Sequence, residues 1–172
     1  GSTGKTTTKN LVRDVCAAGK TVVATRANQN NELGVPRTLL AADADTQVVV
    51  VEMGMRGRGQ IAALCDYVRP DWGLVTNVGE SHIELLGSRE GIARAKAELL
   101  EALPGGTGIA FLNEADDFFS FVAEEAQLEK RAVGRVAFNG DPSRAALIPG
   151  QLPMAAVWAE DQRLDEEGHP LF

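Results

Sequence analysis

The residues best suited to chemistry open the chain, in the run Gly1-Ser2-Thr3-Gly4-Lys5-Thr6-Thr7-Thr8. Gly4-Lys5-Thr6 matches the second half of the phosphate-binding loop pattern, in which a Gly and four residues precede Gly-Lys-[Ser/Thr]. In such a loop, backbone N–H groups surround phosphate oxygens at the positive end of the following helix. Lys5 would reach the outer phosphates, and the Thr6 hydroxyl would bind a Mg²⁺ ion. We therefore expect residues 1–7 to bind a nucleotide. The alternative, a Gly/Thr-rich tail, is disfavoured because a helical pattern starts directly after Thr6.

Two further polar residues follow predicted strands. The segment 47–51, with valine at positions 48–51, is the clearest strand pattern in the chain, and it fits a parallel strand covered on both faces. Glu52 ends this run, and a carboxylate at that point is typical of the residue that holds the Mg²⁺ of a nucleotide. His82 follows a predicted strand over 72–78, and ligands of open parallel sheets bind beyond the carboxyl ends of the strands. We expect both side chains near the phosphate loop, with a solvated strand end and a structural histidine as the alternatives.

A lysine interrupts the apolar stripe of a predicted helix over 88–103. Ile92, Leu99 and Leu103 define the stripe, and Lys96 falls within it, four residues after Ile92. Such a lysine usually extends its ammonium to solvent. Otherwise it is used chemically, because burial lowers the pKa of the ammonium and a neutral amine can be modified. The spacing leaves both interpretations open.

Composition bounds the class of protein. At 172 residues with 44% hydrophobic and 24% charged residues, the chain is a globular domain of ordinary size. The formal net charge is −7, with the acidic excess in the second half, which argues against a nucleic-acid partner. Cys16 and Cys65 are the only cysteines and lack CxxC spacing, so neither a disulfide framework nor a zinc site is indicated. The chain has no apolar run near 18 residues and no signal-peptide pattern, which predicts no membrane insertion and a cytoplasmic location.

Helical and strand patterns alternate along the chain, which predicts an α/β fold with a mostly parallel sheet flanked by helices. Leu11, Val12, Val15 and Cys16 lie at helical spacing, and Leu39 and Leu40 are expected on the inner face of a second helix. Strands are expected near residues 21–25, 47–52, 72–78, 107–112 and 132–138. Residues 142–149 are expected to form a loop.

Taken together, these residues resemble the central ATP-binding domain of the Mur ligase family. The phosphate loop, Glu52, His82 and Lys96 occur in the family's order. Three segments resemble the subtype that adds D-alanyl-D-alanine to UDP-N-acetylmuramoyl-tripeptide: Asn31-Glu32-Leu33-Gly34-Val35-Pro36, Val51-Glu52-Met53-Gly54-Met55-Arg56 and Ala95-Lys96-Ala97-Glu98-Leu99. The resemblance spans most of residues 1–113 and continues more weakly to Phe172.

The resemblance implies a P-loop NTPase-like fold and an ATP-dependent ligase of peptidoglycan precursor synthesis that works through an acyl phosphate. It assigns Lys5 and the loop backbone to the phosphates, Thr6 and Glu52 to one Mg²⁺, and His82 to a second. Lys96 matches the family lysine that is carbamylated by CO₂ and then serves as a metal ligand.

The resemblance also bears on the substrates and on the extent of the protein. Asn30, Asn31 and Thr38 would belong to a loop that meets the UDP-sugar-peptide. Residues 1–172 would be part of a longer enzyme, because the family's UDP-recognition domain and amine-substrate domain are absent from this sequence. We expect the isolated chain to be inactive and the full-length enzyme to be a monomer.

Three alternatives stay open at this point. A small-molecule kinase would need a lid rich in arginine, and no arginine cluster follows the predicted strands. Folylpolyglutamate synthases share the loop and the lysine chemistry but fit the Asn-rich segment less well. A non-catalytic nucleotide-binding domain would carry the loop alone.

Overall fold

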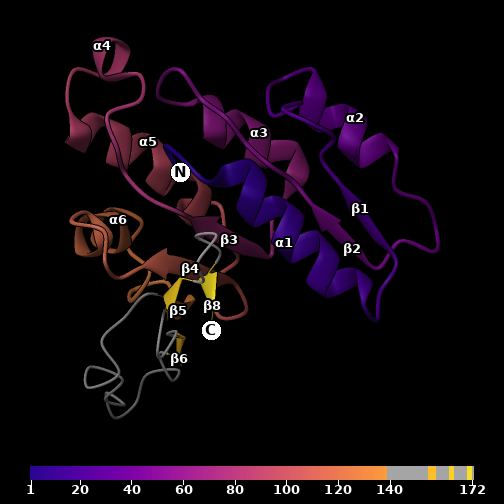
Figure 1. Cartoon of the computed structure of the whole chain (residues 1–172). Helices are drawn as coiled ribbons and strands as arrows, with labels where there is room; N and C mark the ends of the chain where they lie inside the picture. Colours follow the sequence, from indigo (N-terminus) through magenta and orange to yellow (C-terminus); the bar gives the residue numbers. More distant parts are fainter. Residues whose placement is uncertain (139–154, 158–162, 165–169, 172) are drawn as a thin grey trace.

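Helices and strands alternate along the chain in the computed structural model, which describes residues 1–138, 155–157, 163–164 and 170–171 (Figure 1). The helices are α1 (Lys5–Ala17), α2 (Gly34–Leu40), α3 (Gln60–Val68), α4 (Ile83–Leu86), α5 (Arg89–Glu101) and α6 (Phe119–Glu125). The strands are β1 (Val22–Ala24), β2 (Val48–Val50), β3 (Trp72–Val75), β4 (Ile109–Asn113), β5 (Gly134–Phe138), β6 (Ala155–Val157), β7 (Arg163–Leu164) and β8 (Pro170–Leu171). The loop expected over 142–149 lies outside the described residues.

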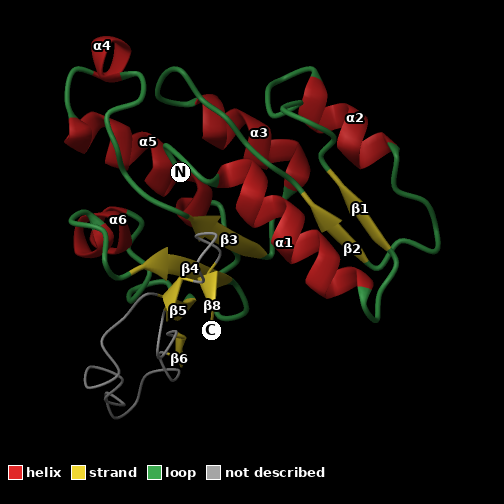
Figure 2. Ribbon diagram, viewed as in Figure 1, coloured by secondary structure: helices red, strands yellow, loops and turns green. Residues whose placement is uncertain are grey.

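The strands pair mainly in parallel, as the alternating pattern predicts (Figure 2). Strand β1 pairs with β2, with Val22 opposite Val48. Strands β3, β4, β5 and β6 form a second parallel sheet in chain order. The short pair β7–β8 is antiparallel. Strands β2 and β3 end earlier than the sequence predicts, so Glu52 and Asn77 lie in the loops just beyond their carboxyl ends. This is the edge where an open parallel sheet presents ligand-binding residues.

Two apolar clusters hold the helices in place. The larger cluster packs α5 and α6 against β3 and β4, and its largest completely buried side chains are Ile92, Leu100, Leu103, Leu128 and Val122. Burial of each such side chain contributes about 1.5–3 kcal/mol. The smaller cluster joins α2 and α3 through Val35, Ile61, Leu64 and Cys65. Leu99 and Met55 contact both clusters, so α5 is fixed against both halves of the chain.

The apolar side chains of α1 lie at helical spacing but are largely exposed. The helix begins at Lys5, slightly before the predicted start, but Val15 is 75% exposed, and Lys9 is the buried residue of the helix. Leu40 is 85% exposed, so its expected inward position is wrong. Val49 of β2 is partly exposed, so the described residues do not cover that strand on both faces. Periodicity shows which side chains share a face, but it does not show whether a described element lies over that face. Among the described residues, no helix is both long and apolar enough to cross a lipid bilayer.

Candidate active site

The loop before α1 is tied to the carboxyl end of β3. The Ser2 and Thr3 N–H groups donate to Asn77 Oδ1 at 2.9 and 3.0 Å, and the Thr76 hydroxyl donates to the Thr3 carbonyl at 2.7 Å. A Cβ on Gly1 would lie 1.5 Å from Thr76 Oγ1, so this position accepts only glycine. Gly4 has a φ of 75°, in the left-handed region that favours glycine. The glycines of the motif are therefore required by the close approach and by the turn.

The same loop is tied to the carboxyl end of β2 through Thr6 and Glu52. The Thr6 hydroxyl donates to Glu52 Oε2 at 2.9 Å, and the Asn30 amide donates to Oε1 at 2.8 Å. Glu52 is buried, and among the described residues it forms no ion pair with lysine or arginine. A buried carboxylate whose partners are both neutral is poorly compensated. Hydroxyl and carboxylate oxygens are the ligands that Mg²⁺ prefers, so Thr6 and Glu52 fit a magnesium ion.

Lys5 lies over this loop. Its ammonium donates to the Gly1 carbonyl at 2.8 Å and is 3.5 Å from the Ser2 carbonyl. The charge is thus held beside the backbone that the motif uses to surround phosphates. A bound phosphate would draw the ammonium away from these carbonyls, because a hydrogen bond between two opposite charges is stronger than one between an ammonium and a neutral carbonyl.

Lys96 approaches the same loop from α5. It is only 6% exposed, and its ammonium donates to Ser2 Oγ at 3.1 Å. Burial, together with the nearby Lys5 ammonium, lowers the pKa of Lys96 to about 8, although the Asp116 carboxylate opposes this shift. About a tenth of such an amine is uncharged at pH 7, far more than for an ordinary lysine. The structure therefore rejects the solvent-exposed interpretation of this residue.

The predicted substrate residues occupy different environments. Asn30 reaches Glu52, as described above, whereas the Asn31 side chain accepts from the Gly34 N–H at 3.0 Å at the start of α2. Thr38 is buried, 3.3 Å from Thr25 Oγ1, and Thr25 Oγ1 accepts from the Glu52 N–H. Asn31 and Thr38 thus have structural partners, and their substrate contacts stay predictions.

His82 stands apart from the other predicted residues. It precedes α4 with a φ of 68°, in the left-handed region. Within residues 1–138 it makes no hydrogen bond to Thr6, Glu52 or Lys96, and the described residues hold no cluster of three or more His, Cys, Asp or Glu side chains suited to a metal. A metal-binding role for His82 stays a prediction.

Sequence reasoning missed two residues that support the loop. The Asn77 side chain holds the loop by accepting from its backbone N–H groups. Asp116, in the loop after β4, accepts from the Val78 N–H at 2.8 Å. Asn77 could have been found as a polar side chain at a predicted strand end. Asp116 gives no comparable signal, because an acidic residue before a helix is already explained as a cap.

A parallel α/β sheet, a Gly-Lys-Thr loop between two strand ends and a buried carboxylate beside its threonine define a P-loop type of nucleotide-binding domain. Comparison with known proteins gives the family. The model of the Mur ligase middle domain matches residues 1–159, and the chain belongs to this family. The family resemblance and the fold expected from the sequence are thereby confirmed.

Relatives at the sequence level are UDP-N-acetylmuramoyl-tripeptide–D-alanyl-D-alanine ligases. The one from Mycobacterium tuberculosis is 41% identical over 172 residues, which is 100% of this chain and 30% of that protein. The one from Synechocystis sp. is 57% identical over 104 residues, which is 60% of this chain and 23% of that protein. The chain thus spans less than a third of the length of these relatives.

Solved structures of the same subtype share the fold. MurF from Acinetobacter baumannii superposes with a TM-score of 0.78 and 30% identity over 95% of this chain and 32% of that chain. MurF ligase from Thermotoga maritima, solved in complex with ADP, gives a TM-score of 0.67 and 30% identity over 81% of this chain and 31% of that chain. A folylpolyglutamate synthase mutant from L. casei is 16% identical with a TM-score of 0.52, which shows a shared fold alone.

Proposed function

We propose that residues 1–172 are part of the central ATP-binding domain of a ligase that joins D-alanyl-D-alanine to UDP-N-acetylmuramoyl-tripeptide in peptidoglycan precursor synthesis. The observation that carries the proposal is the convergence of Lys5, Thr6, Glu52 and Lys96 on one loop. The relatives named for this reaction supply the substrates. The MurF ligase from Thermotoga maritima, which was solved in complex with ADP, supports the proposal of a nucleotide at this loop.

In this reaction the backbone N–H groups at the start of α1, from Gly4 to Thr6, and the Lys5 ammonium bind the phosphates of ATP, because Asn77 holds the Ser2 and Thr3 N–H groups. A carboxylate oxygen of the tripeptide attacks the γ-phosphorus, and the bond to the bridging oxygen breaks, which releases ADP and leaves an acyl phosphate. The amine of D-alanyl-D-alanine then attacks the acyl carbon. The tetrahedral intermediate expels phosphate, and the nitrogen loses a proton. Lys5 acts by neutralising charge on the transferred phosphoryl group.

Thr6 and Glu52 would hold a Mg²⁺ ion, which supplies positive charge to the phosphoryl oxygens. The Thr6–Glu52 hydrogen bond supports this assignment, because it keeps two hard oxygen ligands together at the start of α1. His82 is proposed for a second Mg²⁺ by the family resemblance alone.

We propose that Lys96 is carbamylated. The lone pair of the neutral amine attacks CO₂, a C–N bond forms, and the nitrogen releases one proton to give a carbamate anion. The lowered pKa of Lys96 supports the step, because it supplies the neutral amine near neutral pH. The carbamate replaces the buried Lys96 ammonium, which repels Lys5, by an anion. This anion would serve as a metal ligand.

A basic groove beside Thr6 offers room for the anionic substrate. The groove has a volume of about 800 Å³ and lies between α1, β1 and α2. Of the described residues that line it, Lys9, Arg13, Arg26 and Arg37 are basic and none is acidic. A net charge of −7 for the chain makes this local excess of positive charge notable. The groove therefore suits the carboxylates and phosphates of a UDP-sugar-peptide, with Thr38 on its wall.

The decisive experiment uses the full-length enzyme with ATP, UDP-N-acetylmuramoyl-tripeptide and D-alanyl-D-alanine. Phosphate release should require both substrates, and Lys5→Ala should lower kcat by about 10² or more. Phosphate release supported by other acceptors, but not by this pair, would contradict the proposed ligase. Nucleotide binding without turnover would favour a non-catalytic domain. The expected monomeric state, cytoplasmic location and lack of a nucleic-acid partner stay predictions.

A further inference from the structure

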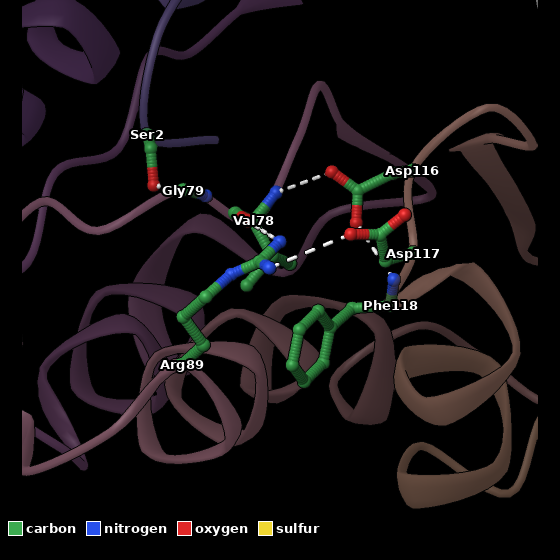
Figure 3. A network of polar contacts seen from close by, with 7 residues as sticks. All are labelled: Ser2, Val78, Gly79, Arg89, Asp116, Asp117 and Phe118. Carbon is green, nitrogen blue, oxygen red and sulfur yellow. Dashed lines mark hydrogen bonds and ion pairs between the residues drawn. The ribbon is translucent and has the colours of Figure 1, made fainter.

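We propose that Asp116 and Arg89 are positioning residues that hold the backbone N–H and carbonyl of Val78 (Figure 3), so that the following Gly79 N–H fixes the Ser2 hydroxyl to which Lys96 donates. The expected effect of these residues on kcat rests on the proposed function. Its structural part, the bracing of the phosphate loop from the loops after β3 and β4, is independent of the substrates.

Both polar groups of the Val78 backbone are held by side chains. The Val78 N–H donates to Asp116 Oδ2 at 2.8 Å, and one Arg89 nitrogen donates to the Val78 carbonyl at 2.9 Å. The next amide along the chain, that of Gly79, donates to Ser2 Oγ at 2.9 Å. The direction of the Gly79 N–H is therefore set by two side chains that do not themselves touch the phosphate loop.

Ser2 Oγ is the point where this chain of contacts meets Lys96. It accepts hydrogen bonds from the Gly79 amide and from the Lys96 ammonium, at 2.9 and 3.1 Å. A hydroxyl oxygen has two lone pairs and one hydrogen. Because both lone pairs are used, the Ser2 hydrogen must point away from both donors, where it can serve a bound anion. A hydroxyl fixed in this way is preorganised as a donor.

The two positioning residues, Asp116 and Arg89, both contact Phe118. The Phe118 N–H donates to Asp116 Oδ1 at 2.9 Å, which closes a turn before α6. The Arg89 guanidinium lies 4.7 Å from the centroid of the Phe118 ring. Arg89 and Lys96 are seven residues apart on α5, so they lie two turns apart on nearly the same face. One rigid helix thus contacts the Val78 carbonyl with one residue and Ser2 with the other.

Gly79 is favoured by the closeness of the two loops. A Cβ at this position would lie 3.1 Å from Ser2 Cβ, so one of the loops would have to shift by a few tenths of an ångström to accept it. The loop keeps its separate bonds from Ser2 and Thr3 to Asn77. Loss of Asp116 should therefore leave the nucleotide cradle in place and disturb the Ser2 hydroxyl and Lys96, which predicts a lower kcat with little change in KM for ATP.

A double-mutant cycle in the full-length enzyme tests the proposal. Asp116→Ala should lower kcat by roughly ten- to a hundredfold, as displacement of an active-site group by about 1 Å does. In a Ser2→Ala background the same substitution should have a clearly smaller effect on kcat, because the part carried by the Val78 and Gly79 backbone passes through Ser2 and only the direct electrostatic effect on Lys96 remains. The matched control is Glu124→Ala, expected within about twofold of the parent, since that carboxylate lies exposed on α6. Equal effects of Asp116→Ala in both backgrounds would overturn the proposal.

A second readout does not depend on turnover. Hydrogen exchange, followed on fragments containing Ser2 and Gly79, should be faster in Asp116→Ala than in the parent and unchanged in Glu124→Ala. Unchanged exchange in Asp116→Ala would overturn the proposal even where the enzyme is active. A parent that lacks ligase activity would instead refute the proposed function and leave this result standing. Should Asp116→Ala not fold, Arg89→Leu, which removes the donor to the Val78 carbonyl, replaces it in both measurements, with the same outcomes for and against.

Discussion

Replacing Lys96 by methionine should make the protein more stable while removing its activity. The pKa of Lys96 falls from 10.5 to about 8 in the folded chain, mainly because the ammonium is buried. A difference of about 2.5 pKa units corresponds to about 3 kcal/mol, by which the folded state disfavours the charged amine at pH 7. Methionine fills a similar volume without a charge. It leaves Ser2 Oγ with one donor fewer, which costs about 1 kcal/mol. The expected net gain is about 2 kcal/mol.

The sign and the pH window follow from the direction of the shift. Below pH 8 the lysine is protonated in both states, and the folded protein bears the whole penalty. Between pH 8 and 10.5 the folded state has lost the proton and the unfolded state has kept it, so the stability of the parent rises with pH. The advantage of Lys96→Met should therefore shrink to below about 1 kcal/mol near pH 9.5.

Thermal unfolding of the full-length protein in CO₂-free buffer measures this difference. A gain of about 2 kcal/mol should raise the Tm of this domain by roughly 4–8 °C at pH 7. CO₂ must be excluded, because a carbamate would remove the buried cation from the parent. A methionine variant that is less stable than the parent at pH 7, or whose gain does not change with pH, would refute the argument that Lys96 is a strained buried cation.

Three further substitutions in the full-length enzyme test the proposed roles of single residues. Glu52→Gln should raise the Mg²⁺ concentration needed for half-maximal activity, and so should His82→Ala if it binds a second ion; unchanged Mg²⁺ titrations would leave both residues structural. Lys96→Ala should be rescued in part by bicarbonate or short carboxylic acids, and a variant as active as the parent would exclude carbamylation from the reaction. Arg37→Glu in the basic groove should raise KM for the UDP-linked substrate at least about fivefold and leave KM for ATP unchanged; equal changes in both would argue against substrate in the groove.

The sequence by itself determined the elements that depend on local order. Gly4-Lys5-Thr6 identifies the loop, because close approach to phosphate requires glycine and a helix must start at that point. The valine run before Glu52 predicts a parallel strand that ends in a carboxylate, and Glu52 is found just beyond β2 beside Thr6. Both inferences use neighbouring residues and the general rule that parallel strands present ligands at their carboxyl ends.

Tertiary structure alone decided which side chains are buried and which meet across long separations. Val15 and Lys96 both lie on predicted helices, yet Val15 is exposed and Lys96 is buried against Ser2, 94 residues away in sequence. Asp116 reads as a helix cap, but its carboxylate also holds the backbone of Val78. Periodicity fixes the face of a helix, whereas the partner of that face is set by how α5, α6 and the two sheets pack together. The depressed pKa of Lys96 is a product of that packing, because both its burial and its distance from Lys5 arise only in the folded chain.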